Sequence, residues 1–517
     1  MSNNTPTEPT LLWYDYETWG ANPIRDRLAQ FAAIRTDLNL NPIEEPINLL
    51  CKPACDTIID PEAVTITGLS PLTLSEEGMN EWDFANEIEQ HFSKPGTCTT
   101  GYNTIRFDDE CTRFLFYRNL IDPYAREWKN GNSRWDLLDV MRMARALRPD
   151  GIEWPVHEDG SPSFKLEHLT AANGLSHEHA HDAVSDVKAT IALAKLLKQH
   201  QPKLFDYAFT LRSKHQVRKH LNLSDQTPHL HFSGKIAAKE FCMGIEIPLL
   251  THPDRANEVI VIDIRQDPSW LLHHDAETIK NWLYSKTEDL PEGIARPPLR
   301  TIHLNRSPMI APMSLLDNMT SERLSIDKNL LDTHARFVHQ HPELNRLALD
   351  VFTAEREHRV NEDPEQALYE GFIDDHDRNL LNRMRKNSIR KSHWLDEADA
   401  LHDDRLPPLL NNILARHFPD VLTEAQLEQW QKKRRSAMSD SGVLSIDQAL
   451  EKIPQLQQQY PNLAALQDTQ HYLLSLKNQW FGVQASNTPQ DQQMADIEHN
   501  DSDDTSVLTS HQQMDLF

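Results

Sequence analysis

The stretch LLWYDYETWG, residues 11–20, ends an apolar run with two acids that are separated by one tyrosine. Successive side chains on a strand point to opposite faces, so Asp15 and Glu17 would lie side by side on one face. Two carboxylates this close repel each other unless a positive charge lies between them. The stretch therefore predicts a strand that ends in a site for a metal cation.

The composition bounds the class of protein. A chain of 517 residues is too long for one hydrophobic core, so about three domains are expected. The start of the chain lacks the pattern of a signal peptide, and no apolar run approaches the roughly 18 residues of a membrane helix. The cysteines are too scattered for a disulfide framework, so a cytoplasmic protein is expected. The net charge of −26 does not exclude a nucleic-acid partner, because affinity depends on where the basic residues lie.

The hydrophobic periodicity divides the chain into four segments. Residues 9–195 read as an α/β unit, with strands over 11–17, 28–37, 44–53 and 97–103 and helices over 80–93, 108–120 and 183–201. Residues 202–352 read as a β-rich or mixed domain, and residues 358–482 as a helical domain that includes a helix over 365–386. The acidic, polar segment 483–517 cannot bury enough apolar surface to fold and is predicted to be disordered.

Further acids and one histidine stand at helix starts within the α/β unit. Asp108 begins one predicted helix, and Asp186 lies in the first turns of another, five residues after His181. Alone, an acid at a helix start often only complements the helix dipole, and a lone histidine in a loop is most often surface decoration. Together with Asp15 and Glu17 they form a set suited to two divalent cations. Such ions stabilise the attacking and leaving oxygens of a phosphoryl displacement, with His181 as general base for the water.

The motifs DYET, NTIRFDD and HDAVSD resemble those of the DEDDh exonuclease superfamily. Longer stretches, among them NSRWDLLDVMRMARALRPDGI and PSFKLEHLTAANG, resemble the bacterial exodeoxyribonuclease I family over roughly residues 9–480. The resemblance implies a ribonuclease-H-like exonuclease domain at 9–195, a Src-homology-3-like barrel domain at 202–352 and an α-helical C-terminal domain at 358–482. It also implies a processive 3′→5′ exonuclease that hydrolyses single-stranded DNA with two metal ions. Such an enzyme releases 5′-mononucleotides and acts in DNA repair and recombination.

The resemblance also assigns roles to residues. It places one Mg²⁺ ion on Asp15, Glu17 and Asp186 and a second on Asp15 and Asp108, and Mn²⁺ can substitute. It implies DNA contacts by Glu17 and by five further residues, which are Arg113, Tyr124, Trp128, Arg142 and Lys165. Relatives can carry arginine where this chain has Lys165, and lysine keeps the charge but loses the bidentate fork.

Two protein partners are implied in the same way. Arg148 and Tyr207 match positions that bind the acidic C-terminal tail of single-strand-binding protein. The last residues Gln513, Met514, Leu516 and Phe517 resemble the pentapeptide by which bacterial enzymes dock on the DNA sliding clamp. An apolar anchor on a flexible tether raises the effective concentration of the enzyme at its target. A monomer without membrane contact is expected.

Two alternatives remain open at this point. One is an RNA-directed or proofreading member of the same superfamily, which a comparison of DNA and RNA substrates would separate. The other is a catalytically dead scaffold that only binds single strands. The intact set of acids and His181 speaks against a dead site.

Overall fold

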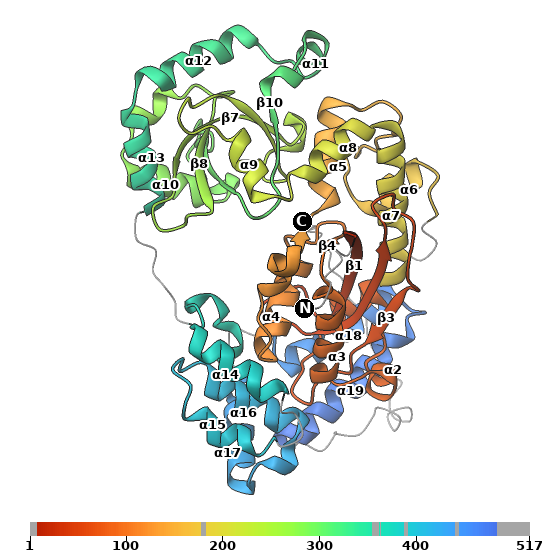
Figure 1. The fold of residues 1–517 in the computed structure, drawn as a ribbon. Coiled ribbons are helices and arrows are strands. Elements are labelled where there is room, and N and C mark those ends of the chain that lie inside the picture. Colours follow the sequence, from red (N-terminus) through yellow and green to blue (C-terminus); the bar gives the residue numbers. More distant parts are fainter. Residues whose placement is uncertain are drawn as a thin grey trace, which may run out of the picture.

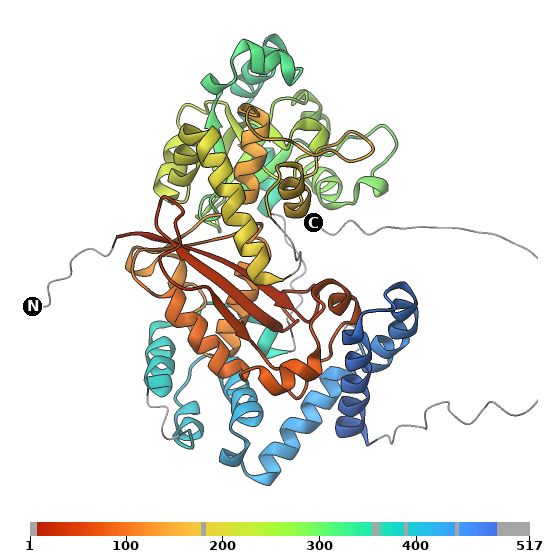
Figure 2. The same ribbon diagram turned by 90° about the vertical axis from the view of Figure 1, so that its right-hand side faces the viewer.

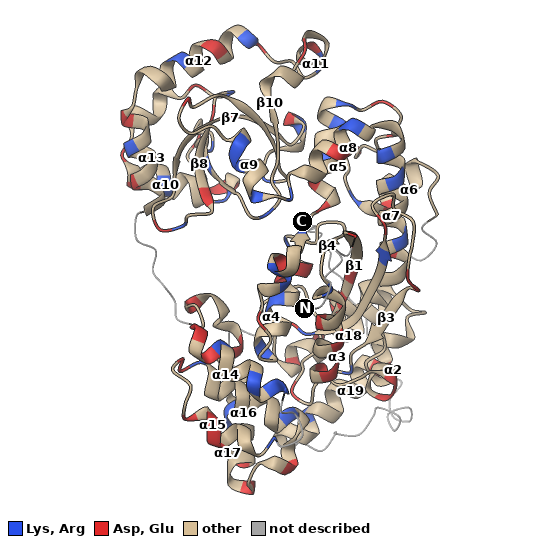
Figure 3. Cartoon of the chain, in the orientation of Figure 1, with Lys and Arg blue, Asp and Glu red and all other residues tan. Residues whose placement is uncertain are grey.

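The computed structural model describes residues 8–176, 182–353, 361, 363–386, 391–439 and 444–482. The chain forms an N-terminal part (residues 8–211), a middle part (212–353) and a helical part (363–482), and Figure 1 shows the other two packed against different sides of the N-terminal part. In the described ranges, none of the helices is long and apolar enough to cross a membrane. Figure 3 shows basic and acidic residues mixed over all three parts, so the negative charge is not gathered in one of them.

A mixed five-stranded sheet forms the centre of the N-terminal part, in the order β3-β2-β1-β4-β5. Its strands are β1 (Thr10–Thr18), β2 (Leu28–Thr36), β3 (Ile47–Leu50), β4 (Thr97–Thr100) and β5 (Ser133–Arg134). The central strand β1 runs antiparallel to β2 and parallel to β4. The four predicted strands of the α/β unit are thus confirmed, with β3 and β4 shorter than expected, and the edge strand β5 was not predicted.

The side chains of β1 alternate between two helical layers. Leu12, Tyr14 and Tyr16 pack with α3 (Glu81–Phe92) and α4 (Asp108–Arg118). Leu11 and Trp13 pack instead with α5 (Leu137–Leu147) and α7 (Ala183–His200). In Figure 2 the yellow α7 crosses one face of the red sheet, and the orange α3 and α4 lie against the other face. The period of two places the residues at 15 and 17 on the α7 face.

The middle part is built on an antiparallel sheet in the order β10-β6-β7-β8-β9. The strands are β6 (His229–Phe232), β7 (Met243–Thr251), β8 (Glu258–Asp263), β9 (Leu299–His303) and β10 (Met309–Pro312). Five of the described α-helices belong to this part, namely α9 (Lys214–His220), α10 (Ala276–Tyr284), α11 (Asn318–Arg323), α12 (Lys328–Gln340) and α13 (Glu343–Thr353). The part is joined to the N-terminal sheet by the Ser307 hydroxyl, which donates to the Arg134 carbonyl oxygen at 2.8 Å. The predicted mixed, β-rich domain is confirmed.

The helical part contains α14 (Asp375–Lys386), α15 (His393–Ala398), α16 (Leu406–His417), α17 (Glu424–Met438), α18 (Ile446–Gln459) and α19 (Ala464–Phe481). The prediction of one helix over residues 365–386 is wrong in its first half. Residues 364–370 form two short 3-10 turns, and α14 begins only at Asp375. The Asp374 carboxylate accepts from the backbone N–H of Asp377, which satisfies a donor of the first turn as an N-cap residue does.

Buried ion pairs join the helical part to the N-terminal part. The Arg416 guanidinium contacts Asp56 at 2.6 Å and also contacts Glu365. Arg27 pairs with Glu365 at 3.0 Å and with Glu81 at 2.6 Å. Although burial opposes ionisation, the arginines lower the pKa of Glu365 to about 2 and hold that of Asp56 well below its usual range. The network therefore consists of charged groups that compensate one another.

The helix α19 packs on another region of the N-terminal part. Ala465 and Leu466 of α19 are buried against Trp19, Ile59 and Leu74. The helices α1 (Pro61–Thr67) and α2 (Pro71–Glu77) also pack there, beside α18 and α19. The two ends of the described chain thus share one small hydrophobic core.

Candidate active site

Three acids from distant positions converge at the end of β1. One carboxylate oxygen each of Asp15, Glu17 and Asp186 lies within 4.8 Å of the others. Asp15 and Glu17 follow Trp13 on the α7 face of β1, and Asp186 lies in the first turn of α7. The Asp182 side chain caps that turn by accepting from the Ser185 N–H at 3.1 Å. The predicted side-by-side placement of the two β1 acids is what the structure has.

The electrostatics of this cluster call for a cation. Burial first, and then the charges of Asp108, Glu17 and Asp186, raise the pKa of Asp15 well above its usual range. Burial and the charge of Asp186 do the same to the pKa of Glu17. Within the described ranges, neither Asp15 nor Glu17 forms an ion pair with lysine or arginine. Oxygen ligands of this kind suit hard divalent cations, so the residues present fit a metal site.

Asp108 and Asp109 are neighbours at the start of α4 but have different surroundings. Asp109 is bound by Arg126 at 2.5 Å and by Arg134 at 2.6 Å, and these arginines lower its pKa against the effect of burial. Asp108 accepts from the Tyr16 N–H at 3.2 Å, and burial together with the charge of Asp109 raises its pKa. Asp108 is therefore the acid of the two that stands beside Asp15 without an arginine.

The acids lie in a groove of about 1320 Å³ between the N-terminal and middle parts. Asp15, Asp108 and Asp186 are among the residues that line it. The middle part contributes basic residues that the sequence analysis did not single out, which are Lys235, Lys239, Arg296 and Arg300. No local pattern marks these residues, because only the packing of one part on the other brings them to the acids.

Two of the predicted DNA-contacting residues lie in this groove. Lys165 lines it with an exposed side chain, 64% accessible, and its ammonium lies 3.9 Å from Glu167. Arg142 also lines it, but its guanidinium pairs with Asp139 and lies over the Phe164 ring, 5.7 Å from the ring centroid. Lys165 is thus the freer of the two cations.

Of the other predicted contacts, Glu17 belongs to the acid cluster and Tyr124 lines a second, more apolar pocket. Trp128 is 67% exposed. Arg113 is buried, and it binds Glu127 at 2.8 Å and Glu110 at 2.6 Å. Its guanidinium stands 5.5 Å from the ring centroid of Tyr124. With these contacts Arg113 holds its acidic neighbours and the Tyr124 ring in place, and its contact to DNA stays a prediction.

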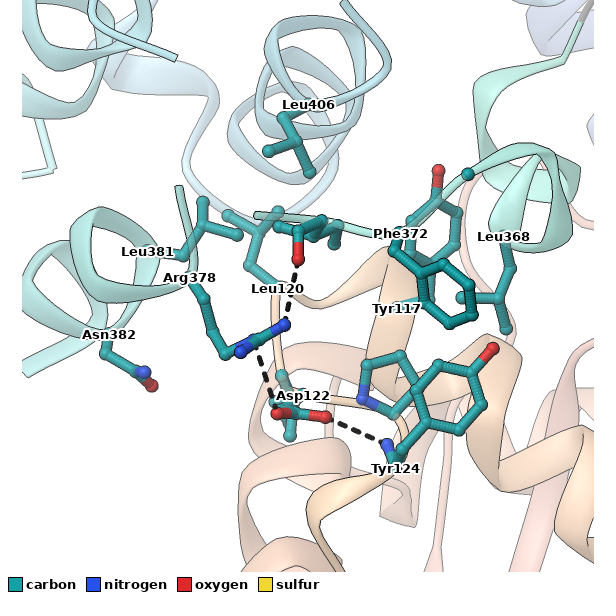
Figure 4. A pocket seen from close by; sticks show the side chains of 14 residues that line it. Tyr117, Leu120, Asp122, Tyr124, Leu368, Phe372, Arg378, Leu381, Asn382 and Leu406 are labelled. Atoms are coloured by element: carbon teal, nitrogen blue, oxygen red, sulfur yellow. Dashed lines mark hydrogen bonds and ion pairs between the residues drawn. The ribbon is translucent and has the colours of Figure 1, made fainter. Parts of the chain in front are cut away.

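Tyr124 lines this pocket between the N-terminal and helical parts (Figure 4). Phe372 is 93% exposed and comes from the helical part at the same pocket. Arg378 bridges the two parts by pairing with Asp122 at 3.7 Å and donating to the Ile373 carbonyl oxygen at 2.8 Å. The pocket therefore offers aromatic surface from two parts of the chain.

Some predicted residues are engaged elsewhere or lie outside the described ranges. The Tyr207 hydroxyl donates to the Ile310 carbonyl oxygen at 2.9 Å, and Arg148 donates to the Leu147 carbonyl oxygen at 2.6 Å. His181 falls in the undescribed segment 177–181, directly before the capping residue Asp182. The segment 483–517, with Gln513, Met514, Leu516 and Phe517, also lies outside the described residues.

Family models match all three parts of the chain in the order in which the structure has them. Residues 12–194 match an exonuclease model. Residues 212–354 match the exonuclease I SH3-like domain, and residues 362–477 match the exonuclease I C-terminal domain. The fold predicted from the sequence is thereby confirmed at the level of domain order.

Individual relatives agree with these models. Exodeoxyribonuclease I of Haemophilus influenzae is 43% identical over 431 residues, which cover 83% of this chain and 91% of the relative. A crystal structure of Escherichia coli exonuclease I in complex with a dA16 oligonucleotide is 39% identical, with a TM-score of 0.85, and the match covers 90% of this chain and 100% of that one. A zinc-bound form of an E. coli exonuclease I complex with single-stranded DNA has a TM-score of 0.84 at 39% identity, with coverage of 90% and 99%.

The matches cover 91–100% of these relatives and include the exonuclease domain that carries the converging acids. The fold is that of metal-dependent exonucleases, and Asp15, Glu17 and Asp186 are placed so that they could hold a metal ion. The chain belongs to the exodeoxyribonuclease I family.

Proposed function

We propose that this chain removes nucleotides one at a time from the 3′ end of single-stranded DNA. The observation that carries the proposal is the cluster of Asp15, Glu17 and Asp186, of which Asp15 and Asp186 line the same groove as basic residues of the middle part. Single strands are bound by basic grooves with aromatic surface nearby. The enzyme would be cytoplasmic, where chromosomal DNA is accessible, and would act in DNA repair and recombination.

The acids define where the reaction takes place. Asp15, Glu17 and Asp186 would hold one Mg²⁺ ion, and Asp15 with Asp108 a second, with Mn²⁺ as a substitute. When bound, the two ions stabilise the charge on the attacking and leaving oxygens. His181 takes a proton from the attacking water, whose oxygen bonds to phosphorus as the bond between phosphorus and the 3′ oxygen of the remaining strand breaks, and the leaving 3′ oxygen takes up a proton from solvent. The products are a 5′-mononucleotide and a strand with a new 3′ hydroxyl.

The residues around the groove position the strand. Lys165, exposed beside the acids, is placed to contact a phosphate. Trp128 and Tyr124 offer aromatic faces on which bases can stack. A strand held between the N-terminal part and both other parts would dissociate slowly, which supports processive degradation.

A single digestion experiment tests the reaction, its polarity and the base. A 5′-labelled single-stranded DNA is incubated with and without Mg²⁺, beside the His181→Ala variant. A ladder that shortens from the 3′ end, depends on metal and is lost in the variant is expected. If no divalent metal supports cleavage, the proposal is wrong and a scaffold that only binds single strands is the better description. Equal cleavage of RNA and DNA would instead favour the RNA-directed alternative.

Two protein partners belong to the proposal. Arg148 and Tyr207 would contact the acidic tail of single-strand-binding protein, and binding of a tail peptide should weaken in Arg148→Ala. The terminal residues Gln513, Met514, Leu516 and Phe517 would dock on the DNA sliding clamp. Removal of the last five residues should abolish clamp binding without changing digestion of free DNA. Unchanged clamp binding after this deletion would refute the docking role.

A further inference from the structure

A second group of metal-binding side chains lies in the helical part, away from the groove. His376 and Asp377 belong to the first turn of α14, and His402 lies in the loop before α16 (Figure 1). One ligand atom of each of these three residues lies within 4.8 Å of the others. Two imidazoles and a carboxylate form a donor set different from the all-carboxylate cluster at β1.

The hydrogen bonds of the two histidines determine which ring nitrogen of each can bind a metal. The His376 Nε2 lies 3.1 Å from the Ala400 carbonyl oxygen, which can only accept, so Nε2 carries the hydrogen and Nδ1 keeps its lone pair. The His402 Nδ1 lies 3.1 Å from the Asp374 carboxylate, so its Nε2 is left as the ligand. A metal-binding histidine typically donates its other N–H to a carbonyl or carboxylate in this way.

The carboxylate of the group is buried and has no cation of its own. Asp377 is inaccessible, and its oxygens accept from the backbone N–H groups of His402 at 3.0 Å and Asp403 at 2.9 Å. In the described part of the chain it forms no ion pair with lysine or arginine. The nearby Arg378 and Arg405 are paired with Asp375 and Asp403. The backbone bonds orient Asp377 and leave its negative charge uncompensated.

We propose that His376, Asp377 and His402 bind one divalent cation of the zinc class. Nitrogen donors favour Zn²⁺, Ni²⁺ or Co²⁺ over Mg²⁺, which prefers oxygen ligands. The two imidazole rings lie 4.3 Å apart and 12° from parallel. An imidazole binds a metal in the plane of its ring, so one ring must turn. His402, with 64% of its side chain exposed, is the ring that turns, and the half-exposed Asp374 side chain moves with it to keep its contact to Nδ1. The bound ion would fasten α14 to the loop that leads into α16.

Counting bound zinc tests this site directly. The full-length protein is dialysed against Zn²⁺ in excess Mg²⁺, and the bound metal is measured by elemental analysis. The variant His376→Ala/His402→Ala should hold one equivalent less than the wild type. His393→Ala removes an exposed histidine of α15 in the same part of the chain and should hold as much as the wild type. Equal zinc in the double variant and the wild type would overturn the proposal.

Two further readouts separate metal binding from a folding defect. Asp374→Asn keeps a side chain that can cap α14 but removes the carboxylate behind His402. It should weaken Zn²⁺ binding about 10–100-fold, the usual effect of losing such an outer partner. Zn²⁺ should raise the Tm of the wild type and of His393→Ala, but not that of the double histidine variant. An equal Zn²⁺-dependent rise in all of them would assign the effect to other sites and refute the proposal.

Discussion

Glu17 is a carboxylate whose charge no lysine or arginine balances within the described residues. Its side chain is 7% exposed, and burial and Asp186 raise its pKa. The ionised form is disfavoured in the folded state. The contribution of Glu17 to the free energy of unfolding is therefore fully present below its unfolded pKa and is lost as the pH rises through its folded pKa. In Glu17→Gln this charge is absent. Without metal at pH 7 we expect this variant to be more stable than the wild type by about 1–3 kcal/mol, measured by urea unfolding in EDTA.

The same substitution should damage catalysis while it stabilises the protein. We expect digestion of single-stranded DNA to slow by about 100-fold or more. Removal of even an outer partner of a metal site lowers metal affinity or activity by about 10–100-fold. Glu76→Gln, an exposed acid on α2, is the matched control and should change neither quantity. A Glu17→Gln protein with normal digestion would show that Glu17 holds no catalytic metal.

Residue positions that depend on local chemistry could be predicted from the sequence. The alternation of β1 was enough to place Asp15 and Glu17 together, and the turn before α7 was enough to place Asp186 in a first turn. The distinct surroundings of Asp108 and Asp109 were not predictable from spacing alone. They arise because Arg126 and Arg134, which follow 17 and 25 residues after Asp109, fold back onto it.

At the scale of elements, the start of α7 links a helix cap to the active site. Asp182 accepts from the Ser185 N–H and so fixes the turn that carries Asp186. Asp182→Ala should lose about 0.5–2 kcal/mol of stability and should also slow digestion, because the first turn frays. Asp182→Ser retains a capping oxygen and should restore most of both. Comparable losses in the serine variant would mean that the charge of Asp182, not its cap, is what matters.

The buried pair of His229 on β6 and Glu246 on β7 predicts that acid lowers the stability of the middle part. His229 is buried opposite Glu246, and burial lowers its pKa to about 4 although Glu246 acts in the opposite direction. Between the ordinary histidine pKa of about 6.5 and this value, the unfolded chain takes up a proton that the folded chain refuses. The free energy of unfolding therefore falls as the pH drops through this window.

Without His229, the free energy of unfolding should depend less on pH in this window. Between pH 7 and pH 5, we expect the free energy of unfolding to fall by about 2 kcal/mol less in His229→Gln than in the wild type. Urea unfolding at both pH values measures this difference. His273→Gln, which replaces an exposed histidine of the same part, should behave like the wild type. If all three proteins lose stability equally, proton uptake elsewhere governs the acid response.

At the scale of the whole molecule, the attachment of the helical part depends on Arg416. This residue pairs with Asp56 of the N-terminal part and with Glu365 of the helical part, and all three are nearly inaccessible. In Arg416→Met both acids stay buried with one arginine fewer, since Arg434 still pairs with Asp56 and Arg27 still pairs with Glu365, and the loss should cost about 1.5–3 kcal/mol. We expect the helical part to loosen, so that calorimetry resolves a separate transition and digestion of long strands becomes less processive.

A second arginine provides the control for this experiment. Arg435 is exposed on the neighbouring α17 and lies outside the ion network. Arg435→Met therefore removes the same charge and volume but leaves the network intact. It should leave the calorimetric profile unchanged. A single, unshifted transition in Arg416→Met would show that apolar packing alone holds the two parts together.

The assembly of the three parts was only partly predictable. Domain order followed from periodicity and from the resemblance, but the basic residues that line the groove from the middle part carry no local pattern. The early turns at residues 364–370 were missed for a related reason. Glu365 is drawn into the ion network by Arg27 and Arg416, and this contact between distant segments outweighs the helical pattern of the sequence.

The small core shared by Trp19, Leu74 and Leu466 has a consequence for synthesis on the ribosome. Leu74 is made long before Ala465, 391 positions later in the chain. At about 5–20 residues per second, this apolar surface of the nascent protein waits roughly 20–80 s for the helix that covers it. During translation the N-terminal part must therefore tolerate an open hydrophobic face or be shielded by a chaperone, and its final closure can occur only after the last helix has left the exit tunnel.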